Sequence, residues 1–92
     1  MPRALLDYLG YIIYFWAGDM SEPIHVHIAK GEQTENATKV WITEDGVRLA
    51  HNNSHIPQKD LKALLQFIAD NREEIAFRWM TVFNQKGELK KF

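Results

Sequence analysis

The hydrophobic pattern of this chain changes its period at Pro57, and that change limits the folds that the chain can adopt. Before the proline, short runs alternate apolar and polar residues, as half-buried strands do. After it, apolar residues recur at spacings of three and four, which is the pattern of one helix face. The sequence therefore predicts an α+β fold, in which an antiparallel sheet of three or four strands packs against a long C-terminal helix.

Four runs carry the strand pattern, at residues 11–17, 24–30, 37–43 and 47–50. The run at 11–17 is apolar or aromatic on both faces, which predicts a strand covered on both sides. Residues 44–46 are a strong hairpin turn between the last two runs. Residues 3–9 fit either a short partner strand that turns at Leu9-Gly10 or a helical turn. A β meander over residues 1–56 follows.

The helical pattern runs from about residue 57 to residue 84. Pro57 suits the first turn of a helix, and Asp60 is favourable near its positive end. One continuous helix of that length would span about 40 Å, which is long for a domain of this size. Two interpretations stay open: a single helix that buries Trp79 and its last turns against another chain, or a break at residues 70–71 that folds two helices onto the sheet.

Length and composition indicate one domain over residues 1–92, with a basic tail at 85–92. The chain has no cysteine, which excludes disulfides, thiolate chemistry and cysteine zinc sites. Its longest strongly apolar run, 11–17, is too short to cross a bilayer, and no signal-peptide pattern precedes a cleavage site. We expect a cytoplasmic protein with no membrane partner.

Charge and motifs exclude several functions. The formal net charge is −1, and no long basic stripe is present to hold a duplex by its phosphates, although a small single-stranded RNA contact stays open. The chain has no phosphate-cradling glycine loop, no Gly-x-Ser-x-Gly elbow and no paired-carboxylate constellation. Nucleotide binding of the common kinds, serine hydrolase chemistry and glycosidase chemistry are therefore not expected.

The best candidate site lies in the segment from Glu22 to His27, which contains Pro23 and two histidines. Pro23 favours an extended entry, so His25 and His27 leave the same face of a strand about 7 Å apart. The same alternation adds a cationic and aromatic set to this face: Lys39, Trp41 and Arg48. Ordinary amphipathicity also explains the face, with Trp41 covered by the N-terminal segment or by a second subunit.

These residues fit more than one chemistry. A divalent metal would take Glu22, His25 and His27, with His51 or His55 as further ligands, but no second ligand cluster has a defined spacing.

A metal-independent catalytic site would use one of the two strand histidines as base and the other as acid. Lys39 or Arg48 would then hold phosphate charge. As a binding surface, the face would use Trp41, with Trp79 from the helix. No other cofactor is indicated.

The chain also resembles the short prokaryotic proteins grouped as domain-of-unknown-function family 4160. The residues that carry the resemblance are Met1-Pro2, Gly10-Tyr-Ile-Ile-Tyr, Glu22-Pro23-x-His25-x-His27, Lys30-Gly31, Asn71-Arg72-Glu73-Glu74-Ile75, Trp79 and the ending Gly87-Glu-Leu-Lys-Lys. The resemblance implies a small α+β protein, often encoded beside a member of another uncharacterised family, number 2442. That pairing suggests a toxin–antitoxin-like module, and no established activity comes with it.

Two functional hypotheses follow. In the first, the protein is one half of a two-protein module and holds a small protein encoded by a neighbouring gene through protein–protein interaction. In the second, it is a small RNA-binding protein or ribonuclease that uses His25 and His27. We also expect a homo-oligomer that associates through the helix and the aromatic strand, because the chain has more apolar side chains than a short helix-on-sheet domain can bury.

Overall fold

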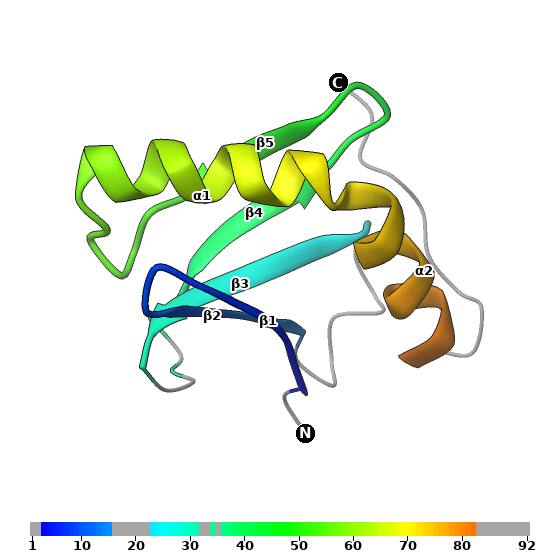
Figure 1. Cartoon of the computed structure of the whole chain (residues 1–92), viewed down its shortest axis with the longest axis horizontal. Coiled ribbons are helices and arrows are strands. Elements are labelled where there is room, and N and C mark those ends of the chain that lie inside the picture. Colours follow the sequence, from blue (N-terminus) through cyan, green and yellow to red (C-terminus); the bar gives the residue numbers. More distant parts are fainter. Residues whose placement is uncertain (1–2, 16–22, 32–33, 35, 83–92) are drawn as a thin grey trace.

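Five strands form one antiparallel sheet in chain order, and two helices follow them. The structure, a computed structural model, describes residues 3–15, 23–31, 34 and 36–82 (Figure 1). Its elements are β1 (Arg3–Tyr8), β2 (Tyr11–Phe15), β3 (His25–Lys30), β4 (Thr38–Ile42), β5 (Val47–His51), α1 (Gln58–Asp70) and α2 (Arg72–Val82). The predicted α+β class is confirmed, and the N-terminal residues add a fifth strand to the sheet. The predicted basic tail lies outside the described residues.

The first hairpin closes through a turn of only two residues. Tyr8 and Tyr11 are paired, and the residues between them, Leu9 and Gly10, have φ angles of 54° and 81°. Two consecutive positive φ angles match the right-handed twist of the flanking strands, which is why such turns join hairpins. Glycine adopts this conformation without strain, whereas leucine does not.

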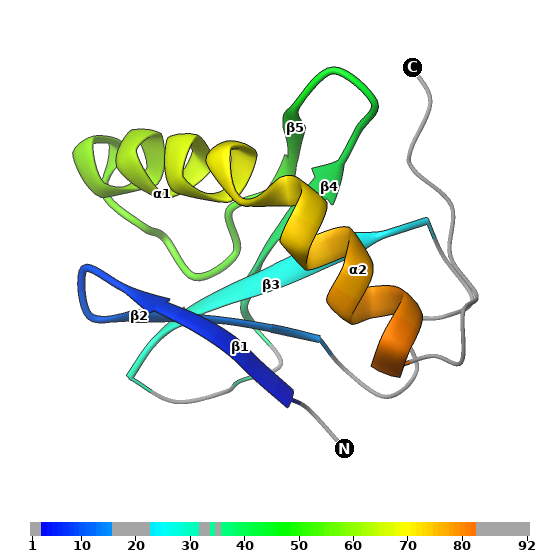
Figure 2. The same ribbon diagram turned by 45° about the vertical axis from the view of Figure 1, so that its right-hand side comes forward.

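Both helices lie on the same side of the sheet, as the two views show (Figures 1 and 2). The main core fills the space between them, because alternate residues of each inner strand point toward the helices. The sheet contributes mainly Ile13, Phe15, Val26, Ile28, Val40 and Ile42, and the helices contribute Leu61, Leu64, Ile68, Ile75 and Trp79. The other side of the sheet carries a second, smaller buried cluster, which consists of Tyr14, Ala29 and Ala37.

Asn71 separates two helices, so the predicted break at residues 70–71 is confirmed and the alternative prediction of one continuous helix over residues 57–84 is wrong. Its backbone N–H bonds to the carbonyl oxygens of Phe67 and Ile68 at 3.2 and 3.1 Å, and its side-chain Nδ2 donates to Phe67 O at 2.8 Å. Its own carbonyl accepts the N–H of Ile75 at 3.0 Å, which begins the next helix. The break turns α2 so that Trp79 is buried within its own chain and not against another.

Candidate functional site

The strand register places seven side chains in two rows across the sheet, on the face opposite the main core. The first row crosses four strands through paired residues and consists of Tyr14, His27, Lys39 and His51. The second row crosses three strands and consists of His25, Trp41 and Arg48. We call these two rows the histidine face. Adjacent strands lie about 4.8 Å apart, so members of a row are direct neighbours.

His25 is the buried end of the second row of the histidine face. Its side chain is 0% exposed, and its ring centroid lies 5.0 Å from that of His27, 5.4 Å from Trp41 and 5.3 Å from Trp79. The Nδ1 atom lies 2.8 Å from the carbonyl oxygen of Pro23. A carbonyl oxygen only accepts, so Nδ1 carries a proton and the orientation of the ring is fixed. The proline before the strand therefore holds this histidine in place.

His27 and Lys39 are partly exposed in the middle of the face. The Lys39 ammonium lies 4.3 Å from the ring centroid of Trp41, which is a cation–π contact. Next to His27, Tyr14 is buried, and its hydroxyl donates to the backbone oxygen of Thr34 and accepts from the Thr34 N–H. Thr34 thus lies against the Tyr14 end of the first row, whose next two members are the partly exposed His27 and Lys39.

His51 belongs to this face because of an irregularity in strand pairing. Lys39 pairs with His51 while the next residue, Val40, pairs with Leu49, so Ala50 is an extra residue on β5. Such a bulge reverses the alternation beyond it. Arg48 and His51 consequently share a face although they are three residues apart. Strict alternation assigns His51 to the other side, and the sequence offers no clear signal for the bulge.

The surroundings of His51 disfavour its charged form. Burial, the positive charge of Lys39 and the charge of nearby His27 all lower the pKa of His51 below its ordinary value of 6.5. Its Nδ1 atom is buried and has no hydrogen-bond partner among the residues that the structure describes. Because Lys39 and His27 both influence the pKa of His51, these three members of the first row are close enough to interact electrostatically.

The described residues do not fit a metal site. No group of three or more histidine, aspartate or glutamate side chains within residues 3–15, 23–31, 34 and 36–82 could hold an ion. The predicted ligand Glu22 lies outside the described residues. His55 is exposed in the turn after β5, away from the paired rows, with a φ of 57°. The predicted metal chemistry therefore gains no support from the geometry of His25 and His27.

The two tryptophans predicted to form a binding surface have different positions. Trp41 is partly exposed in the second row of the histidine face. Trp79 is 0% exposed, and its ring meets Phe15 edge-on at a centroid distance of 5.0 Å. The prediction of Trp79 as a surface residue is therefore corrected, because the helix break at Asn71 places it in the core. Arg48 is exposed on β5, at the edge of the sheet.

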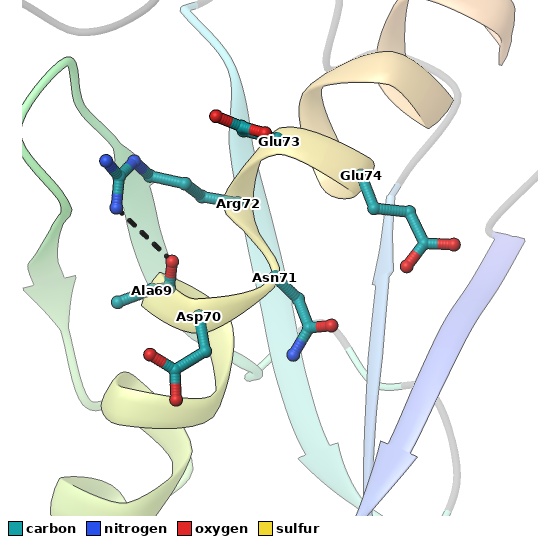
Figure 3. A pocket seen from close by; sticks show the side chains of 6 residues that line it. All are labelled: Ala69, Asp70, Asn71, Arg72, Glu73 and Glu74. Carbon is teal, nitrogen blue, oxygen red and sulfur yellow. Dashed lines mark hydrogen bonds between the residues drawn. The ribbon is translucent and has the colours of Figure 1, made fainter.

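A second polar region surrounds the junction of the two helices. It is an open depression of about 450 Å³ lined by Ala69, Asp70, Asn71, Arg72, Glu73 and Glu74 (Figure 3). The side chains of Arg72, Glu73 and Glu74 point in different directions there, and Arg72 donates from Nη1 to the carbonyl of Ala69 at 3.4 Å. Groups that diverge in this way cannot surround a small ligand. The Asn-Arg-Glu-Glu sequence therefore forms the helix break.

Fold and site together define a small α+β protein with a histidine-rich sheet face. The family model described as Domain of unknown function (DUF4160) matches residues 10–80, so the chain belongs to that family. The match runs from the first hairpin turn to the last turns of α2, and it confirms the resemblance seen in the sequence. No curated protein and no solved structure matches the chain. Among the described helices, none is long and apolar enough to cross a membrane.

Proposed function

We propose that this protein is one component of a two-protein, toxin–antitoxin-like module and that it binds its partner protein through the histidine face. The observation that carries the proposal is the partly exposed Trp41 in the middle of the second row of the histidine face. Tryptophan and arginine are enriched among the residues that dominate protein–protein interfaces. Trp41, with Arg48 beside it, supplies such an anchor.

Charge indicates the chemistry of the partner. Neither row of the histidine face contains a carboxylate, whereas Lys39 and Arg48 supply two cationic groups. A complementary surface would present aspartate or glutamate around an apolar centre that receives Trp41. Complementary charges increase the association rate and exclude wrong partners more than they increase affinity. We therefore propose an acidic partner, and we propose that the neighbouring gene encodes it.

Co-expression with the product of the neighbouring gene tests the proposal. The tagged chain should retain that product on an affinity column. Trp41→Ala should weaken binding about thirtyfold, because truncation of a central interface residue costs about 2 kcal/mol or more. Leu9→Ala is the matched control, since Leu9 is 54% exposed in the turn between β1 and β2, outside the two rows. Equal affinity of the Trp41→Ala variant and the native chain would contradict the assignment of the face.

The second candidate is an RNA-binding protein or ribonuclease that uses the pair His25 and His27. The observation that favours it is the mixture of aromatic and cationic groups in adjacent rows. Nucleic acids without secondary structure bind to such mixtures, because aromatic rings stack on bases and cations contact phosphates. Fluorescence polarisation with a labelled single-stranded RNA tests this candidate. Affinity should fall with added salt, and it should fall further in the Arg48→Gln variant.

We propose self-association through α2 alone, without the aromatic strand that the sequence analysis included. The aromatic strand β2 lies inside the sheet between β1 and β3, and its residues Tyr11, Ile13, Tyr14 and Phe15 are buried. The exposed apolar side chains of α2 are Phe77 and Met80, 69% and 39% exposed. We propose that two copies pair through these two residues. Light scattering at tens of micromolar should give a dimer for the native chain and a monomer for Phe77→Asp.

A further inference from the structure

Lys39 lies between two histidines in the first row of the histidine face. It pairs with His27 of β3 on one side and with His51 of β5 on the other. Two strand spacings separate the backbones of the two histidines, which is about 10 Å. The three side chains thus form a line of imidazole, ammonium and imidazole on adjacent strands of a rigid sheet. His25 is not a member of this line, and its ring is buried and held by Pro23.

We propose that this line is a ribonuclease site in which His51 is the general base, His27 is the general acid and Lys39 stabilises the phosphate. The proposal rests on the second candidate function, RNA recognition by the histidine face, and it replaces His25 with His51 as the partner of His27. The substrate class is single-stranded RNA, because bases and phosphates of a single strand can lie along an open sheet surface.

The reaction is an internal transesterification that needs no metal, water or other reactant. His51 removes the proton of a ribose 2′-hydroxyl, and the 2′-oxygen forms a bond to the adjacent phosphorus. The bond from phosphorus to the 5′-oxygen of the next nucleotide breaks, and His27 gives that oxygen a proton. The products are a 2′,3′-cyclic phosphate and a free 5′-hydroxyl. Lys39 stabilises the negative charge that develops on the non-bridging oxygens.

The environment of His51 agrees with the role of base. Burial and the charges of Lys39 and His27 lower the pKa of His51, so its ring is neutral and able to accept a proton near neutral pH. Arg48 lies on the same strand and the same face, and it is exposed. It is placed to hold a neighbouring phosphate of the RNA, which would fix the register of the strand on the site.

The test uses the full chain with a 5′-labelled single-stranded RNA oligonucleotide in the presence of EDTA. The native protein should produce fragments that end in a 2′,3′-cyclic phosphate. An oligonucleotide of the same sequence with 2′-deoxyribose throughout should stay intact, because it lacks the nucleophile. His27→Ala and His51→Ala should each reduce the rate about 10²–10⁴-fold, the usual contribution of a general acid or base. Lys39→Gln should also reduce it.

The matched control is His55→Asn. His55 is exposed outside the rows at a positive φ, and asparagine tolerates that conformation. All variants are purified in parallel and compared by thermal melting. Where an alanine variant melts early, His27→Gln or His51→Gln replaces it. No cleavage by the native chain, cleavage of the deoxy substrate, or an unchanged rate in both histidine variants would overturn the proposal. RNA binding without cleavage would overturn this inference alone and leave RNA recognition standing.

Discussion

The indole of Trp79 packs against the imidazole of His25, with ring centroids 5.3 Å apart and planes inclined by 61°. One residue lies on the C-terminal helix and the other begins β3. The contact therefore couples the helix break to the histidine face, because only the turn at Asn71 brings α2 to this end of the sheet (Figure 2). His25 in turn lies against His27 and Trp41, so the core and the site share one packed cluster of rings.

Replacement of Trp79 by alanine should destabilise the protein severely. The side chain is 0% exposed and packs against Phe15 and His25, so its removal leaves a large cavity. We expect a loss of about 3–5 kcal/mol in the free energy of unfolding. Thr81→Ala, two residues away on the exposed side of the same helix, should change it by less than about 0.5 kcal/mol. Urea unfolding measures both, and equal losses would contradict the assigned orientation of α2.

The two histidines of β3 should differ in their contribution to stability. His25→Ala removes a buried ring and the N–H that Pro23 O accepts, which should cost at least about 1–3 kcal/mol. His27 is partly exposed, so His27→Ala should cost less than about 1 kcal/mol. Thermal melting compares the variants. If the His27→Ala variant melted at a lower temperature than the His25→Ala variant, His27 and not His25 would be the more buried ring, which would contradict the structure.

Most of the fold follows from the hydrophobic period of the sequence. Alternation in β3 and β4 placed His25, His27, Lys39 and Trp41 on one face, and the register confirms that placement. Alternation failed at His51, because a bulge is set by pairing between strands and leaves no mark in a local pattern. The apolar spacing left the helix break at residues 70–71 open as one of two interpretations. Ile68 and Ile75 are seven residues apart, which is nearly two helical turns, so the apolar spacing continues across Asn71.

The hydrogen bonds of Asn71 give the helix break its own test. Asn71→Ala removes the side-chain donor to Phe67 O and should cost about 1 kcal/mol in the free energy of unfolding, as the loss of a helix cap does. Gln66→Ala is the control, because it removes an exposed hydrogen bond to Asp70 within α1. Denaturant unfolding should place the Asn71 variant clearly below the control. The same midpoint for both would mean that packing alone determines the break.

Leu9 offers a stabilising substitution. Its φ of 54° is unfavourable for a residue with a branched side chain, and the side chain is 54% exposed. Leu9→Asn creates the Asn-Gly pair that two-residue hairpin turns prefer. We expect the free energy of unfolding to rise by up to about 1 kcal/mol. Leu9→Ala, which keeps the strain and removes the same exposed apolar surface, should give no such gain. A lower melting temperature for Leu9→Asn would argue against this turn conformation.

The pKa of His51 should depend on its neighbour Lys39. Burial is the largest cause of the lowered pKa, and the charge of Lys39 is the next. Lys39→Gln should therefore raise the pKa of His51 toward its ordinary value of 6.5 without restoring it fully. Histidine ring signals followed by NMR from pH 4 to 8 measure the change. Lys59→Gln on the exposed side of α1 is the control and should leave the His51 titration unchanged.

The same shift makes stability depend on pH. Since the folded pKa of His51 lies below the unfolded value, the unfolded chain binds the proton first as the pH falls. The contribution of His51 to stability is thus fully present above about pH 6.5 and is lost as the pH falls through the folded pKa. His51→Asn should remove this part of the pH dependence, whereas His55→Asn should retain it. Urea unfolding of both variants at several pH values measures the difference. Parallel pH profiles for His51→Asn and the native chain would contradict the partly buried position of His51 beside Lys39 in the first row.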